Sequence, residues 1–233
     1  MNRIVAVMKK QLKDTLKNMM TLVPFLLFPV VAYVFTELVA KPSADLPDTF
    51  FVAIFAAMYT GYVPIVNMAS IISEEREKKS LRMLIMSNVK PFEYLIGVGG
   101  YVLLLCVLAG IVFGLIGMYS GADLVRFVLV MAAGALASIL LGSAVGVSSK
   151  NQGAAHALAM PFALIAGFVP MVAMFNDTFA RIAKVLYTQQ ISIMISDTSA
   201  SNVALGRFAI IGANMLIFLM VFVFAYRKAD LKD

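Results

Sequence analysis

The sequence of residues 94–119 is YLIGVGGYVLLLCVLAGIVFGLIGMY, which contains no charged side chain. As a helix that rises about 1.5 Å per residue, this run is long enough to cross the hydrocarbon core of a bilayer, about 30 Å thick. Similar apolar runs recur between polar connections. We therefore predict an all-α polytopic membrane protein, with one transmembrane domain over residues 1–233 and spans at about 19–39, 50–72, 94–119, 124–147, 154–175 and 208–226.

The overall composition agrees with a membrane protein. Hydrophobic residues make up 61% of the 233 residues, charged residues make up 14%, and the mean hydropathy is +0.91. The net charge of +6 does not indicate a nucleic-acid partner, because the basic residues flank apolar runs and form no basic face with interleaved aromatic residues. We expect the lipid bilayer as the main surroundings of the chain.

The distribution of basic residues predicts the topology. Placing the N-terminus inside puts most of the 19 Lys and Arg residues in inner segments. The outer segments then hold Lys41, Arg126, Arg181, Lys184 and Arg207. Because Lys and Arg in short connections favour the cytoplasmic side, this predicts a multi-pass plasma-membrane protein with both termini in the cytoplasm.

Two further segments are helical by pattern but unsuited to crossing a bilayer. Residues 2–17 repeat apolar side chains every four positions and place lysines on other faces, which predicts a helix on the membrane surface. Residues 176–207 alternate short apolar and polar pieces, which predicts interfacial or re-entrant helices.

Small residues recur every four positions in the fourth predicted span, namely Gly134, Ser138, Gly142 and Gly146. Gly110 and Gly114 repeat this spacing in the third. Such residues allow close approach of helix backbones in lipid. We interpret them as helix-packing positions, with a mobile interface or a substrate path as the alternative.

Polar residues in the second predicted span are candidates for a pathway. Tyr59, Tyr62 and Asn67, together with Thr60, lie close to Pro64 in the sequence. Polar side chains in a membrane span either line a path or join helices by hydrogen bonds. Both interpretations stay open.

The sequence offers no catalytic or metal site. Residues 142–150 are glycine-rich but lack the order G-x-x-x-x-G-K-[ST] that binds nucleotide phosphates. Cys106 is the only cysteine and His156 the only histidine, which excludes cysteine clusters and histidine-based zinc sites. We therefore expect no enzymatic activity, metal or cofactor in this chain.

The most charged stretch runs from residue 73 to residue 91. Ser73 is suited to cap a helix whose first turn holds Glu74, Glu75 and Glu77. Leu81 and Leu84 then form a short apolar face, too small to insert into lipid, which predicts contact with a partner. The alternative is a solvated loop beside the headgroups.

This stretch also bears a family resemblance. Residues 74–89, EEREKKSLRMLIMSNV, followed by EYLIG at 93–97, resemble the pattern E-E-R-E-x-G-T-L-x-x-L-x-x-S-P-x of the ABC-2 type membrane permeases, the transmembrane subunits of ATP-binding cassette exporters. Lys79 stands where glycine is common and Asn88 where proline is common. These departures concern the turn after the helix.

The resemblance implies an arrangement and a set of partners. Residues 2–17 would be an interfacial elbow helix, residues 74–90 would contain a cytoplasmic coupling helix, and residues 176–205 would be extracellular re-entrant helices. The coupling helix would dock on a separate ATPase subunit that holds ATP and Mg, and two identical or related permease subunits would pair around a central path. The residues assigned to this coupling are Glu74, Glu75, Arg76, Glu77, Leu81 and Leu84.

The sequence indicates only the class of the transported substrate, and it leaves two alternative functions open. The 16 methionines and 17 phenylalanines favour a hydrophobic or amphipathic substrate such as a peptide, drug or lipid. A non-transporting scaffold or immunity protein is one alternative. An intramembrane protease of the CAAX-processing group is another, but its E-E-x-x-x-R motif is not met, because Lys79 follows Glu75 by four positions and His156 is the only histidine.

Overall fold

The computed structural model of the chain describes residues 3–17, 19–43, 45–78, 91–196 and 205–228. Within these residues the chain is helical and contains no β-strand. In chain order the helices are α1 (Arg3–Lys17), α2 (Met19–Phe35), the π-helical segment η1 (Thr36–Ala40), α3 (Phe50–Glu77), α5 (Pro91–Ile116), α6 (Gly121–Ser148), α7 (Gln152–Ala173), α8 (Asp177–Ala183), α9 (Tyr187–Ser196) and α10 (Leu205–Lys228).

Six helices of the described residues are long and apolar enough to cross a membrane: α2 with η1, α3, α5, α6, α7 and α10. The predicted all-α membrane fold with six spans is therefore confirmed. The first span contains Pro24 and Pro29 and remains helical through both. Its last five residues form η1, which ends beside an exposed ion pair between Lys41 Nζ and Glu37 Oε1 (2.5 Å).

The end of α3 differs from the prediction. The helix continues past residue 72 to Glu77 without a break, so the expectation that Ser73 caps a new helix is wrong. Ser73 is instead buried within α3, and its Oγ donates a hydrogen bond to the Ser70 carbonyl oxygen (3.0 Å). The apolar pattern of the span ends here, but neighbouring helices supply partners for the polar residues that follow.

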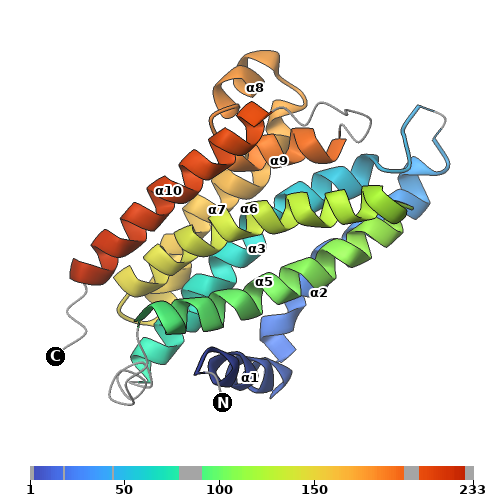
Figure 1. The fold of residues 1–233 in the computed structure, drawn as a ribbon. Helices are drawn as coiled ribbons and strands as arrows, with labels where there is room; N and C mark the ends of the chain where they lie inside the picture. Colours follow the sequence, from blue (N-terminus) through green and yellow to red (C-terminus); the bar gives the residue numbers. More distant parts are fainter. Residues whose placement is uncertain (1–2, 18, 44, 79–90, 197–204, 229–233) are drawn as a thin grey trace.

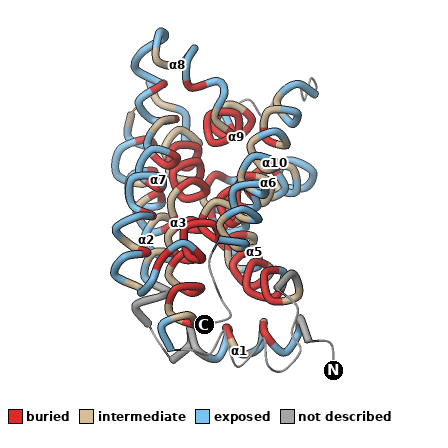
Figure 2. Tube along the Cα trace, turned by 90° about the vertical axis from the view of Figure 1, so that its left-hand side faces the viewer, coloured by how far each residue is buried: buried red, intermediate tan, exposed pale blue. Residues whose placement is uncertain are grey.

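α3 forms the centre of the bundle (Figure 1). It packs most extensively against α6 and α7, and it also contacts α2, α5 and α9. Figure 2 shows the buried residues gathered in the middle of the bundle and the exposed residues on its outside. α10 lies at an edge, where it packs against α6 and α9 and leaves most of its surface exposed.

The two ends of the bundle have different partners. α1 lies across the end at which α10 finishes, and α8 and α9 lie at the opposite end (Figure 1). These two short helices fall within the segment predicted to hold re-entrant helices, residues 176–205, of which 197–204 lie outside the described residues. Whether α8 and α9 re-enter the membrane stays a prediction.

Small residues bring α3 into close contact with α6 and α7. A Cβ atom placed on Gly142 of α6 would lie 2.6 Å from the carbonyl oxygen of Ile65 in α3. A Cβ on Gly61 of α3 would lie 2.5 Å from the carbonyl oxygen of Ala166 in α7. Within the α6 repeat, a Cβ on Gly134 would likewise lie 2.5 Å from Thr60 Cγ2, and one on Gly146 would lie 2.9 Å from Ile72 Cβ, both in α3. The helix-packing interpretation of the four-residue repeat in α6 is therefore confirmed.

Candidate functional site

The last turn of α3 holds Glu74, Glu75, Arg76 and Glu77 at the end of the bundle where α1 lies. Successive residues of a helix point about 100° apart, so adjacent side chains reach different neighbours. Glu75 contacts α1, Arg76 contacts the end of α6, and Glu77 contacts the start of α7. We refer to Glu75, Arg76 and Glu77 as the α3 clamp.

Glu75 attaches α1 to the bundle. Its side chain is buried, and its Oε1 accepts hydrogen bonds from Lys10 Nζ (2.7 Å) and Gln11 Nε2 (2.5 Å). Lys10 is partly exposed, whereas Gln11 is buried together with Val7 one turn earlier. A buried carboxylate is stable only with such donors, because removing it from water is costly. The contact therefore links the amphipathic α1 to the end of α3, in addition to the packing of α1 against α5 and α2.

Arg76 binds the carboxyl end of α6. Its Nη1 donates hydrogen bonds to the carbonyl oxygens of Val147 (2.5 Å) and Ser149 (3.0 Å). The last carbonyl groups of a helix have no partner inside that helix and form its negative end. A guanidinium satisfies both requirements, since it supplies N–H donors and positive charge. Arg76 thus joins the end of α3 to the end of α6.

Glu77 and Ser70 bind the start of α7. Glu77 Oε2 accepts a hydrogen bond from the backbone N–H of Gln152, the first residue of α7 (3.0 Å). A carboxylate at a helix amino terminus is favourable because the first N–H groups are unpaired and the helix dipole is positive there. Gln152 Nε2 also donates to Ser70 Oγ (2.8 Å). The turn between α6 and α7 is therefore held against α3 on both sides.

The remaining coupling candidates have other positions. Glu74 accepts a hydrogen bond from Lys78 Nζ, four residues later on the exposed side of α3 (2.5 Å). Leu81 and Leu84 lie outside the described residues. The docking role assigned to these six residues from the sequence stays a prediction, but the structure places Glu75, Arg76 and Glu77 in contacts within the chain.

The three pathway candidates are placed differently from one another. Tyr59 is fully buried, with its ring against Phe25, Phe28 and Phe113 from α2 and α5. Asn67 is also buried, and its Nδ2 donates to the Val63 carbonyl oxygen of the same helix (3.0 Å).

Tyr62 is only partly buried, and its hydroxyl lies 3.3 Å from the sulfur of Met160 in α7. Within the chain, Tyr59 therefore joins helices, and Tyr62 has the most accessible position of the three candidates. The pathway prediction itself stays a prediction.

A buried polar junction joins α3, α6 and α9 at a carbonyl group that Pro64 leaves without its helical hydrogen bond. Proline has no N–H, so Pro64 leaves the carbonyl oxygen of Thr60 without its partner four residues later. Ser138 of α6 supplies the missing donor, with its Oγ 2.6 Å from this oxygen. The same Oγ lies 2.6 Å from the hydroxyl oxygen of Tyr187 in α9.

Several residues of these contacts were not identified from the sequence. Lys10 and Gln11 belong to the amphipathic pattern of α1, but no motif distinguishes them from the other polar residues there. The acceptors of Arg76 are backbone carbonyls, which leave no signal in a sequence. Ser138 belongs to the four-residue repeat and Pro64 lies among the pathway candidates, but the bond from Ser138 to the Thr60 carbonyl depends on the relative position of α6 and α3. No group of three or more His, Cys, Asp or Glu residues that could hold a metal occurs in the described part of the chain.

Comparison with known proteins identifies the family. No curated protein matches the chain. The model of a family described as "ABC-2 family transporter protein" matches residues 36–227, which include η1, all of α3 with the α3 clamp, α5 to α9 and α10 up to residue 227, but not α1 or α2. With its six apolar helices, the chain belongs to the ABC-2 family of transporter proteins and is a multi-pass membrane permease.

Proposed function

We propose that this permease is the membrane subunit of an ATP-driven exporter and that its ATPase is a separate subunit docked at the α1 end of the bundle. Membership of the ABC-2 family implies association with an ABC ATPase. The finer parts of the proposal are the docking place, two paired permease copies and export of a hydrophobic or amphipathic substrate. Both termini lie in the cytoplasm, as the distribution of Lys and Arg predicts.

The α3 clamp is the observation that supports docking at this end. The segment assigned to coupling, residues 74–90, begins with the turn that contacts α1, α6 and α7 and continues in the sequence through residues 79–90. A displacement of this segment by an ATPase therefore acts on a turn that is hydrogen-bonded to three other helices. Coupling of this kind requires that the two arrangements of the permease make different contacts with the ATPase.

The test is purification of the tagged chain from native membranes in mild detergent, followed by an assay of ATP hydrolysis. We expect an ATPase subunit to co-purify with the unaltered chain. The double variant Leu81→Asp/Leu84→Asp removes the apolar face predicted from the sequence and should lose the ATPase while still inserting into the membrane. Leu205→Asp is the matched control, because Leu205 is 86% exposed and begins α10 at the opposite end.

Two results would contradict the proposal. If the double variant retains as much ATPase as Leu205→Asp, the docking place is wrong. An ATPase-free oligomer obtained from native membranes would favour a non-transporting scaffold.

A further inference from the structure

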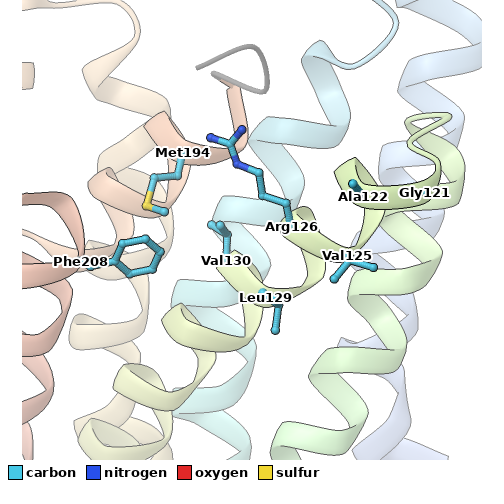
Figure 3. Close-up of a pocket in the computed structure, with 8 residues that line it drawn as sticks. All are labelled: Gly121, Ala122, Val125, Arg126, Leu129, Val130, Met194 and Phe208. Atoms are coloured by element: carbon cyan, nitrogen blue, oxygen red, sulfur yellow. The ribbon is translucent and has the colours of Figure 1, made fainter. Parts of the chain in front are cut away.

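A groove lies beside α6 at the end of the bundle opposite α1 (Figure 3). It has a volume of about 410 Å³, within the range of small-molecule binding sites. α6 forms one wall, and Met194 of α9 and Phe208 of α10 form the other. The α6 residues that matter for its chemistry are Val125, Arg126 and Leu129.

The groove has a polar end and an apolar end along the axis of α6. Arg126 lies near the start of the helix, and its guanidinium extends from α6 towards Met194 (Figure 3). Leu129 and Val130 follow almost one turn further along the helix, and Phe208 faces them from α10. A ligand that complements this groove is anionic at one end and apolar along the rest of its length.

The depth of the groove matches the boundary between headgroups and hydrocarbon. α6 has 28 residues and is therefore about 42 Å long, which exceeds a hydrocarbon core of about 30 Å. A helix of this length centred in the bilayer extends about 6 Å beyond the core at each end, which places its first turn among the headgroups and the residues after Arg126 among the acyl chains. Val125 and Leu129 are 58% and 63% exposed, so these walls are accessible to lipid.

The charge of the groove favours an anion. Arg126 is its one charged lining residue among those described, and no carboxylate lines it there; Asp123 lies in the same turn of α6 but is not part of the lining. A guanidinium has several N–H donors in a planar fork, so it can bind a phosphate while it keeps other contacts. A phosphate held in this way would have an apolar groove directly below it.

We propose that this groove binds an anionic phospholipid from the surrounding bilayer, with the phosphate on Arg126 and an acyl chain along Val125, Leu129 and Phe208. The bound lipid fills the space between α6, α9 and α10. By filling this space, the lipid packs α10 more firmly onto the bundle. The site is separate from the α3 clamp, and the proposal does not depend on coupling to an ATPase.

The test is native mass spectrometry of the full chain, released from micelles that contain phosphatidylglycerol or phosphatidylcholine. We expect the unaltered chain to retain phosphatidylglycerol in preference. Arg126→Gln should weaken retention of phosphatidylglycerol about tenfold, as expected for loss of a charge-assisted hydrogen bond. Arg181→Gln is the matched control, because Arg181 is an exposed arginine on α8 outside the groove.

A second variant tests the apolar part of the groove. Val125→Trp keeps Arg126 but fills the space beside it, so it should displace the lipid as Arg126→Gln does. Equal retention of phosphatidylglycerol by the unaltered chain and by Val125→Trp would overturn the proposal. This comparison remains decisive even where Arg126→Gln fails to fold. Equal retention of the two lipids by the unaltered chain would likewise contradict it, whatever the outcome of the ATPase experiment.

Discussion

α3 and α10 are both long apolar helices, but they have opposite places in the molecule. In the candidate span of α3, 72% of the residues in the apolar window are buried inside the protein, whereas in α10 the share is 6%. α10 is nevertheless the more apolar of the two helices. Water drives apolar surfaces together, but lipid is itself apolar and gives no such drive. In this protein, burial in the bundle therefore follows from small and polar residues rather than from hydrophobicity.

The residues of the two helices show the cause. α3 has Gly61 against the backbone of α7, a Thr60 carbonyl bound by Ser138, and the α3 clamp at its end. α10 has glycines too, but a Cβ on Gly212 would meet no atom within 4 Å. Its Phe224 is 70% exposed, as suits a side chain facing lipid.

The largest effect is expected from enlarging a glycine at a helix contact. Gly61→Leu forces a side chain into the Ala166 backbone, which cannot rotate away, and should destabilise the fold by about 3 kcal/mol or more. Gly212→Leu on α10 meets open space and should leave stability nearly unchanged. The measurement is thermal unfolding of both variants in the same detergent, and equal melting temperatures would refute our explanation of the burial of α3.

A smaller effect is expected from the α3 clamp. Glu75→Ala removes the acceptor of Lys10 and Gln11, so α1 should detach from α3 with a loss of about 1–3 kcal/mol. Glu74→Ala removes only a partly exposed pair within one helix, worth about 0.3–0.5 kcal/mol. Hydrogen exchange of the α1 amides measures the difference. Unchanged protection of α1 in Glu75→Ala would show that apolar contacts alone hold this helix.

The polar junction should contribute about 1 kcal/mol, the usual size of a hydrogen bond between membrane helices. Ser138→Ala leaves the Thr60 carbonyl without a donor and removes the contact with Tyr187. Ser148→Ala is the matched control on α6, because Ser148 Oγ donates only to Ala144 of its own helix among the described contacts. Chemical unfolding in mixed micelles compares the two. If both variants lose the same stability, the contact across helices adds nothing.

The smallest effect is expected at the exposed pair beside the first span. The hydrogen bond to Glu37 raises the pKa of Lys41 above its ordinary value of 10.5. Its stabilising contribution is therefore complete below pH 10.5 and is lost as the pH rises through the pKa of the folded protein. Glu37→Gln should return the Lys41 pKa towards 10.5, measured by NMR titration of the lysine side chain. A pKa unchanged by the substitution would exclude Glu37 as the cause.

The spans were predictable because each depends on local composition. An apolar run longer than the bilayer core is thick must be helical, since no water is present to bind its backbone groups. The four-residue repeat in α6 also predicted close helix packing. The end of α3 was not predictable in this way. Ser73 binds the preceding turn of α3, whereas the partners of Glu75 and Glu77 come from distant segments of the chain.

The sequence by itself determined the six apolar spans, the amphipathic character of α1 and the small-residue face of α6, all of which are local patterns. Only the tertiary structure decided that α3 is central, that Glu75, Arg76 and Glu77 contact three different helices, and that Arg126 lies beside an apolar groove. The physical reason is that helix partners in lipid are selected by close packing and hydrogen bonds between residues far apart in the chain. Those contacts depend on how the helices are placed relative to one another, and the periodicity of the sequence does not predict this placement.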